Sequence, residues 1–135
     1  MYTQKKLFMY KELIKRRSKN EPIAYIIREK EFWSKMFLVS PDTLIPRPET
    51  ELMIEKLINI YKKQKISILD IGTGSGCILI SLLSELQNCS GVGIDISKKA
   101  IGIAKKNAIK HKNSNKIEFL NKSLEPKDFD RFLVF

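Results

Sequence analysis

The sequence has few cysteines, one histidine and no long apolar run. Its two cysteines, Cys77 and Cys89, have neither the spacing of metal ligands nor the density of a disulfide scaffold. We therefore expect reduced thiols, no bound metal and a cytoplasmic location. No stretch reaches the roughly 20 apolar residues that a membrane span needs, and the first residues lack the layout of a secretory signal. These absences argue against contact with a membrane.

Positive charge is in excess but unevenly distributed. The formal net charge is +10, made up of +6 in residues 1–35, −2 in residues 36–95 and +6 in residues 96–135. Twenty of the 25 basic residues are lysines spread along helix-like stretches, which is typical of a solvated surface. A contact surface for RNA or for a ribosome-bound partner is the alternative. Nucleic acid is therefore expected as a partner only indirectly.

Apolar spacing in the first half predicts two helices with a hairpin between them. Residues 5–19 have the spacing of an amphipathic helix, and Pro22 ends it. Residues 24–39 are rich in aromatic and β-branched residues and predict two strands that turn at Ser34–Lys35. A second helix is expected from Pro48 to about Lys63. Its predicted buried side is Met53, Leu57, Ile60 and Tyr61.

The second half alternates strands and helices. Strands are expected at residues 65–71, 91–95 and 116–120. The first intervening helix has leucines at helical spacing, and Ser97 is placed to cap the second. The buried positions expected on these two helices are Leu79, Leu82, Leu83 and Leu86, then Ile101, Ala104 and Ala108. This alternation predicts an α/β fold with a parallel sheet.

A glycine-rich turn follows the first of these strands. Glycines at 72, 74 and 76 allow positive φ and let a ligand approach the backbone closely. The helix that begins near Gly76 should direct free amides toward an anion such as a carboxylate. Asp70, at the end of the strand, is a hydrogen-bond acceptor. Ligands of such sheets bind at this end of the strands.

A second acid strengthens the case for a nucleoside cofactor. Asp95 closes the next strand, 25 residues after Asp70, where an acid can accept hydrogen bonds from both ribose hydroxyls. This spacing fits NAD as well as S-adenosylmethionine. The glycine layout is G-x-G-x-G rather than the G-x-G-x-x-G of NAD sites, and an acid at the strand end suits the cationic methionine end. The residues therefore favour S-adenosyl-L-methionine.

Several motifs together resemble one methyltransferase family. "ILDIGTGSG" (68–76) with "GIDIS" (93–97) resembles class I S-adenosylmethionine-dependent methyltransferases. "LIPRPETE" (44–51), preceded by "EPIAYI" and "EFWSKMFLV", resembles the release factor glutamine methyltransferases more specifically. The resemblance runs from about Leu7 to Asp130. It implies methyl transfer to the glutamine amide of the Gly-Gly-Gln motif in peptide chain release factors. It also implies that these release factors are partners of the protein.

The resemblance also implies site residues and a division of the chain. Cofactor-binding roles carry over to Asp70, Gly72, Thr73, Gly74, Ser75, Gly76, Asp95, Ile96, Ser123 and Leu124. Arg47, Pro48 and Glu49 would help to close the site. Residues 1–63 would be the remnant of an N-terminal helical substrate domain with its hairpin linker and first helix. Residues 64–135 would form the N-terminal half of the cofactor-binding domain, a partial Rossmann-like sheet.

The chain also departs from the family pattern. It contains no Asn-Pro-Pro-Tyr, the motif that grips the substrate amide in this family, so no catalytic residue is assigned. Ser123 stands where an acid or amide is usual, and Leu124 where an aromatic residue is common. We expect a chain truncated at both ends that does not transfer methyl groups by itself. A nucleic-acid methyltransferase acting on adenine amino groups and a non-catalytic cofactor-binding fragment are the alternatives.

Overall fold

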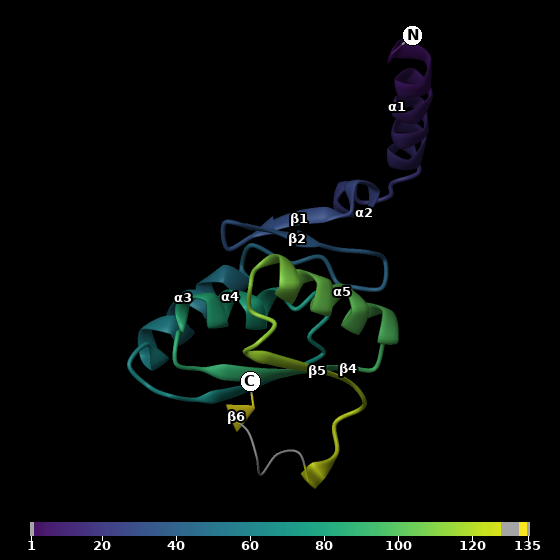
Figure 1. The fold of residues 1–135 in the computed structure, drawn as a ribbon. Coiled ribbons are helices and arrows are strands. Elements are labelled where there is room, and N and C mark those ends of the chain that lie inside the picture. The colour runs from purple at the N-terminus through teal and green to yellow at the C-terminus, as the bar shows by residue number, and fades with distance from the viewer. Residues whose placement is uncertain (1, 128–132, 135) are drawn as a thin grey trace.

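The computed structural model describes residues 2–127 and 133–134 and contains helices, a hairpin and one larger sheet (Figure 1). The helices are α1 (Tyr2–Ser18), α2 (Ile23–Ile27), α3 (Thr50–Tyr61), α4 (Cys77–Glu85) and α5 (Lys98–Lys110). The strands are β1 (Glu29–Phe32), β2 (Lys35–Leu38), β3 (Ser67–Ile71), β4 (Ser90–Asp95), β5 (Ile117–Asn121) and β6 (Leu133–Val134). Within the described residues, no helix has both the length and the apolar character needed to cross a bilayer.

The larger sheet has the strand order β5-β4-β3-β6, and all its pairings are parallel. Helices α3, α4 and α5 lie together on one face of this sheet (Figure 1). The predicted α/β fold with a parallel sheet is therefore confirmed. Because β3 and β4 are neighbours, the loops at their carboxyl ends lie side by side and can build one site.

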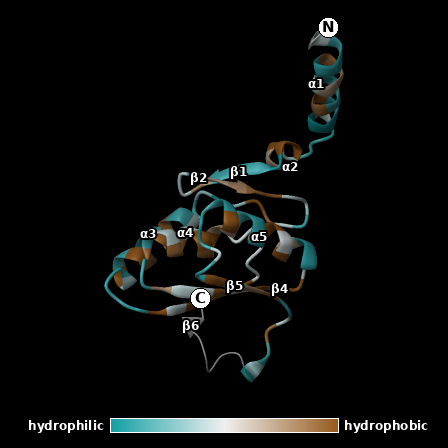
Figure 2. Ribbon diagram, in the orientation of Figure 1, coloured by the Kyte–Doolittle hydropathy of each residue, from teal (hydrophilic) through white to brown (hydrophobic). Residues whose placement is uncertain are grey.

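The core lies between the sheet and these helices and also includes the hairpin. The predicted leucines of α4 and the predicted apolar residues of α5 are buried there. Phe32 and Phe37 of the hairpin and Ile54 of α3 belong to the same cluster. Figure 2 shows hydrophobic residues along the strands and on the helices above them. The hairpin and α3 are thus packed into the core of the unit that carries the glycine turn.

The hairpin forms, but two details of its prediction were wrong. Residues 23–27 form the short helix α2 instead of the start of a strand, because Pro22 begins a helical turn and its carbonyl accepts from the amides of Tyr25 and Ile26. The turn is at Trp33–Ser34, one residue earlier than predicted. Both residues have positive φ, +52° and +54°, as a two-residue type I′ turn requires.

The helix predicted from Pro48 begins at Thr50, and its buried side differs from the prediction. Met53 and Ile60 are 40% and 59% exposed. Leu57 and Tyr61 contact the core as predicted, and Ile54 and Ile58 do so in place of Met53 and Ile60. Met53 and Ile54 are adjacent in the sequence, and packing against α4 selects the second of them. The spacing of apolar residues alone does not show whether Met53 or Ile54 faces the core.

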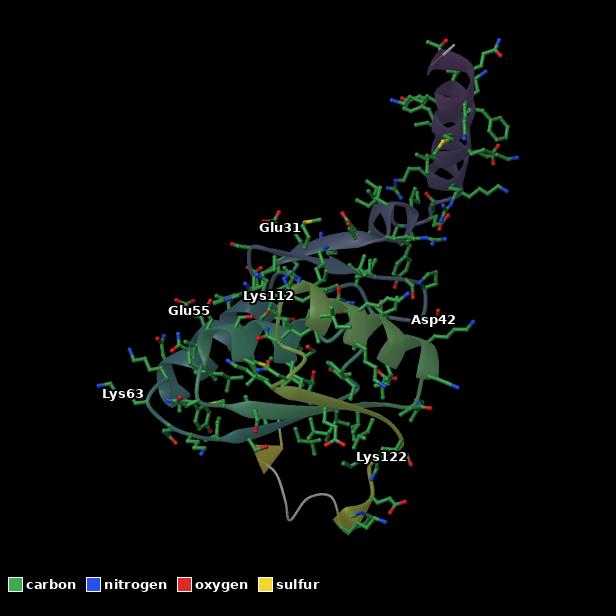
Figure 3. The ribbon with its side chains drawn as sticks, viewed as in Figure 1. Glu31, Asp42, Glu55, Lys63, Lys112 and Lys122 are labelled. Atoms are coloured by element: carbon green, nitrogen blue, oxygen red, sulfur yellow. The ribbon has the colours of Figure 1, made fainter. Side chains whose placement is uncertain are left out.

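Charged side chains cover the outer surface. Figure 3 shows Lys63, beyond the end of α3, and Lys122, beyond the end of β5, at the outside of the ribbon. Helix α1 stands away from the sheet and contacts α2 (Figure 1). The basic residues of its last turn are Lys15, Arg16 and Arg17. The lysine-rich composition thus belongs mainly to solvated surface in the described part of the chain.

Replacing Gly102 by alanine is expected to stabilise the protein. Gly102 lies inside α5, and a Cβ built on it meets no heavy atom within 4 Å. Alanine in a helix interior is favoured over glycine by about 0.5–1 kcal/mol. Urea unfolding of Gly102→Ala should therefore give a free energy of unfolding higher by about this amount. A lower value would show that the backbone of α5 needs glycine here.

Candidate functional site

The site is built on the glycine turn between β3 and α4. Gly72, Gly74 and Gly76 have φ values of +70°, +56° and +79°, a region that other residues enter only with strain. A Cβ on Gly72 would meet no heavy atom within 4 Å, whereas one on Gly76 would lie 3.1 Å from Ile80 Cδ1. The turn is therefore open on its outer side and tightly packed on its inner side.

Most backbone amides of this turn are bound within the protein. The amides of Gly72 and Thr73 both donate to Ile94 O, at 2.9 and 3.0 Å, and the amide of Gly76 donates to Thr73 O at 2.8 Å. Gly74 N donates to a carboxylate oxygen of Asp95. Of the five amides from Gly72 to Gly76, only that of Ser75 has no acceptor in the described part of the chain. The tight turn fixes the other four within the protein.

Asp95 is in the predicted position beside the turn. Its Oδ2 accepts from Gly74 N at 3.0 Å, and its Oδ1 accepts from Ser97 N at 2.9 Å. Ser97 in turn caps α5 by accepting from Ala100 N. An ionised carboxylate has about four acceptor sites, so two bonds leave room for further donors. The protein's own backbone thus orients this carboxylate.

A hollow of about 270 Å³ opens beside Asp95. Its lining brings together residues from the ends of all three long strands: Ile71, Gly72, Ile94, Asp95, Ile96, Lys122, Ser123 and Leu124. Asn121 supports this edge, because its side chain donates to the carbonyls of Asp95 and Ile96 at 3.0 Å. Ile96 is 81% exposed at the rim. Four predicted cofactor residues outside the turn therefore line one hollow, which has an acid and apolar side chains.

A second hollow, of about 130 Å³, lies on the other side of the turn. The loop before α3 forms one wall, and the turn with the start of α4 forms the other. Its lining consists of Leu44, Ile45, Pro46, Arg47, Thr50, Gly72, Thr73, Gly74, Ser75, Cys77 and Ile78. Arg47 thus lies beside the turn, and its role in closing the site stays a prediction. Pro48 and Glu49 are not among the lining residues and precede α3.

The two hollows share one residue, Gly72. Because a Cβ at this position would project into open space, a ligand lying across Gly72 can occupy both hollows at once. One hollow offers the Asp95 carboxylate. The other is lined by Ser75, whose amide has no acceptor and whose buried hydroxyl has no partner of hydrogen-bond geometry among the described residues. This arrangement suits an elongated ligand with a hydroxyl-rich part and an anionic part.

Asp70 is hydrogen-bonded to the glycine turn. Its Oδ2 accepts from the Thr73 hydroxyl at 2.8 Å, and it lines a separate, mainly apolar hollow between β3, α3 and α4. Burial raises the pKa of the Asp70 carboxyl to about 6, with a further rise from the nearby charge of Asp95 and a partial offset from Thr73. Asp70 lines neither of the hollows that meet at Gly72. A direct contact of Asp70 with a cofactor stays a prediction.

The raised pKa of Asp70 predicts that stability falls between about pH 4 and pH 6. The folded protein keeps this proton at pH values where the unfolded chain, with a pKa of 3.8, has lost it. The free energy of unfolding therefore decreases as pH rises through this window, by at most about 3 kcal/mol. Urea unfolding should show Asp70→Asn more stable than wild type at pH 7.5 and nearly equal at pH 4. An equal difference at both pH values would contradict this account.

Two further residues singled out in the sequence have structural roles. Burial raises the pKa of the Cys77 thiol to about 11, and the nearby Ser75 hydroxyl offsets this only partly, so Cys77 is a buried thiol and not a nucleophile. His111 packs its ring on Phe37 at 4.8 Å between centroids. Its Nε2 lies 2.8 Å from Met36 O. His111 thus packs against the hairpin.

Sequence reasoning missed Asn107, which touches the turn. This residue is fully buried on α5, and its side-chain amide donates to Ser75 O at 2.8 Å and to Leu38 O at 3.0 Å. Leu38 N donates back to its Oδ1 at 2.8 Å. The sequence does carry a signal for this role. Asn107 is adjacent to the predicted buried positions Ala104 and Ala108, and a buried side-chain amide needs hydrogen-bond partners.

Known proteins match the chain in sequence. A family model described as a methyltransferase domain matches residues 62–131. A release factor glutamine methyltransferase of Buchnera aphidicola subsp. Acyrthosiphon pisum is 50% identical over 108 residues, covering 80% of this chain and 39% of that protein. Another, of Nitratidesulfovibrio vulgaris, is 42% identical over 112 residues, covering 83% of this chain and 38% of that protein. The chain thus spans about two fifths of the length of these curated relatives.

A solved structure matches the fold. The RNA methyltransferase of Salinibacter ruber, in complex with S-adenosyl-L-homocysteine, aligns with a TM-score of 0.55 and 24% identity over 65% of this chain and 56% of that chain. This likeness confirms the predicted partial Rossmann-like sheet. Asp130, at the end of the predicted resemblance, lies outside the described residues.

Proposed function

Because the chain belongs to the methyltransferase domain family and its resemblance to the release factor glutamine methyltransferases is confirmed, we propose that it binds S-adenosyl-L-methionine across Gly72. The observation that supports this most directly is the meeting of two hollows at that residue. The hydroxyl-rich part of the cofactor would lie beside Asp95, and the methionine part beside Ser75. Ile96 and Leu124 would flank the adenine.

The donor set of each hollow fits its part of the cofactor. Two vicinal ribose hydroxyls need acceptors, and the Asp95 carboxylate has acceptor sites beyond those used by Gly74 and Ser97. The methionine carboxylate needs donors, and Ser75, just before α4, has an amide with no acceptor among the described residues. The helix dipole there favours negative charge. Arg47 would add a positive charge at the rim.

The reaction that we propose for the whole family member is methyl transfer to the glutamine amide nitrogen of the Gly-Gly-Gln motif in peptide chain release factors. The cofactor supplies the methyl group when bound. A carboxamide nitrogen is a weak nucleophile, so catalysis rests on orienting it toward that methyl group. Residues 64–135 would supply the N-terminal half of the cofactor domain, and residues 1–63 the linker toward the substrate. The cytoplasm is the proposed location.

Calorimetric titration with S-adenosyl-L-homocysteine tests the cofactor proposal. We expect saturable binding with one site per chain and no binding of NAD under the same conditions. Binding of NAD without S-adenosyl-L-homocysteine would overturn the cofactor assignment. Failure of both to bind would overturn the proposed role of the two hollows.

Transfer of a labelled methyl group tests the substrate. Release factor, RNA and DNA are offered separately with labelled S-adenosyl-L-methionine. The 135 residues contain no Asn-Pro-Pro-Tyr, so we expect cofactor binding and transfer no higher than background. Labelling of the release factor glutamine would extend the proposal to catalysis by this chain. Labelling of RNA or DNA alone would favour the nucleic-acid alternative.

A further inference from the structure

Asn107 joins two parts of the molecule that are far apart in the sequence. Its Nδ2 donates to Leu38 O at the end of β2 and to Ser75 O in the glycine turn, and its Oδ1 accepts from Leu38 N. Asn107 is 0% exposed. One side chain on α5 therefore satisfies three backbone groups, two part-buried groups on the hairpin and one buried group on the turn.

The chemistry of this position requires a carboxamide. Two of the three partners are carbonyls, which need donors, and the third is an amide, which needs an acceptor. An asparagine side chain has two N–H donors and an acceptor oxygen, and only one orientation of the amide matches all three groups. A carboxylate of the same size would place an oxygen against the two carbonyls. A buried polar group left without a partner is costly.

The bond to Ser75 O controls the geometry of the turn. Ser75 lies between Gly74 and Gly76, whose amides donate to Asp95 and Thr73, while its own amide has no acceptor among the described residues. The Ser75 carbonyl and the Gly76 amide belong to one planar peptide group, and Gly76 N donates to Thr73 O. Holding the carbonyl on one side therefore orients that peptide group and, with it, the start of α4 beside the hollow lined by Ser75 and Arg47.

We propose that Asn107 is a positioning residue that couples the hairpin to the cofactor turn, so that cofactor affinity depends on it. This inference rests on the proposed function, because it assigns to the turn the methionine part of S-adenosyl-L-methionine. Asn107 lines neither hollow that meets at Gly72. Its effect on the cofactor is exerted through Ser75.

Asn113 is a matched control. It is also a buried asparagine, 5% exposed, and its Nδ2 also has two acceptors, Ile80 O at 3.3 Å and Ser84 Oγ at 2.9 Å. Both acceptors belong to α4, on residues that line neither cofactor hollow. Replacing Asn113 thus removes two side-chain hydrogen bonds, one fewer than at Asn107, and leaves Ser75 and Leu38 bound to Asn107.

The experiment compares wild type, Asn107→Asp and Asn113→Asp by titration with S-adenosyl-L-homocysteine, at a temperature where circular dichroism shows each to be folded. We expect Asn107→Asp to bind at least about tenfold more weakly, the size of one lost hydrogen bond. Asn113→Asp should stay within about twofold of wild type, while both variants unfold at lower urea concentrations. Equal weakening in both variants, or wild-type affinity in Asn107→Asp, would overturn the coupling.

A second measurement uses wild type and does not depend on a variant folding. Leu38 N–H donates to Asn107 and lines neither cofactor hollow. The amide resonance of Leu38 should shift when S-adenosyl-L-homocysteine saturates the protein, because the Asn107 side chain is hydrogen-bonded both to Leu38 and to Ser75 of the turn. An unchanged resonance at saturation would refute the coupling while leaving the cofactor proposal intact. If wild type does not bind the ligand at all, it is the proposed function that fails, and the coupling falls with it.

Discussion

Asp95→Ala should weaken binding of S-adenosyl-L-homocysteine by at least about 100-fold. Two hydrogen bonds from ribose hydroxyls to a carboxylate are worth about 3 kcal/mol or more together, which corresponds to this factor. The substitution also removes the acceptor of Gly74 N, which holds the turn, and that of Ser97 N, which lies before α5. Titration calorimetry gives the affinity, and circular dichroism verifies that the variant is folded.

Two further variants separate the role of Asp95 from a general effect of charge. Glu118→Ala removes an exposed carboxylate from the neighbouring strand, at the residue paired with Val92, and should leave affinity unchanged. Asp95→Asn keeps the size but offers fewer acceptor sites, so its affinity should fall between wild type and Asp95→Ala. If Asp95→Ala binds as tightly as Glu118→Ala, the ribose is held elsewhere.

Gly76→Ala should lower the free energy of unfolding by about 2–5 kcal/mol. Positive φ costs a residue with a Cβ about 1–2 kcal/mol, and Gly76 has a φ of +79°. The new methyl group would also lie 3.1 Å from Ile80 Cδ1, 3.3 Å from Ala104 Cβ and 3.4 Å from Phe119 Cζ. Crowding of this kind in a packed core adds about 1–3 kcal/mol. Urea unfolding measures the sum.

Gly72→Ala is the control that isolates the crowding. Its φ is +70°, but no heavy atom lies within 4 Å of the added Cβ. It should therefore cost only the backbone strain of about 1–2 kcal/mol. Equal losses for Gly72→Ala and Gly76→Ala would mean that the inner side of the turn has room for a methyl group. Gly72→Ala should instead reduce cofactor affinity, since its methyl group would enter the space shared by the two hollows.

The glycine turn and the parallel sheet could be predicted because local signals agreed with the global fold. The aliphatic strand ending at Asp70, the three alternate glycines and the cap at Ser97 each constrain the backbone within a few residues. The position of Asp95 could also be predicted, because the carboxyl ends of neighbouring parallel strands lie side by side at one edge of the sheet. These features depend on periodicity and on turn chemistry, which a sequence carries directly.

The missed details depend on contacts between distant segments. Residues 23–27 form a helix where a strand was expected, and the Tyr25 hydroxyl bonds to Thr43 O, 18 residues further along the chain. The Trp33 amide donates to Glu51, 18 residues further along the chain, so that an acid in the first turn of α3 holds the hairpin. Asn107 reaches across 69 residues to Leu38. Such partners become visible only when tertiary structure brings them together.

Helix α1 gives the molecule a region of low local stability. It has 17 residues, and Leu7, Phe8, Tyr10 and Ile14 are all more than half exposed. A helix of this length held by little packing is marginal in water. Its amide hydrogens will exchange with solvent through local fraying. The amide hydrogens of β4, which is paired with β3 and β5, will exchange only through global unfolding. Protease cleavage will therefore begin near Asn20 and leave the sheet whole.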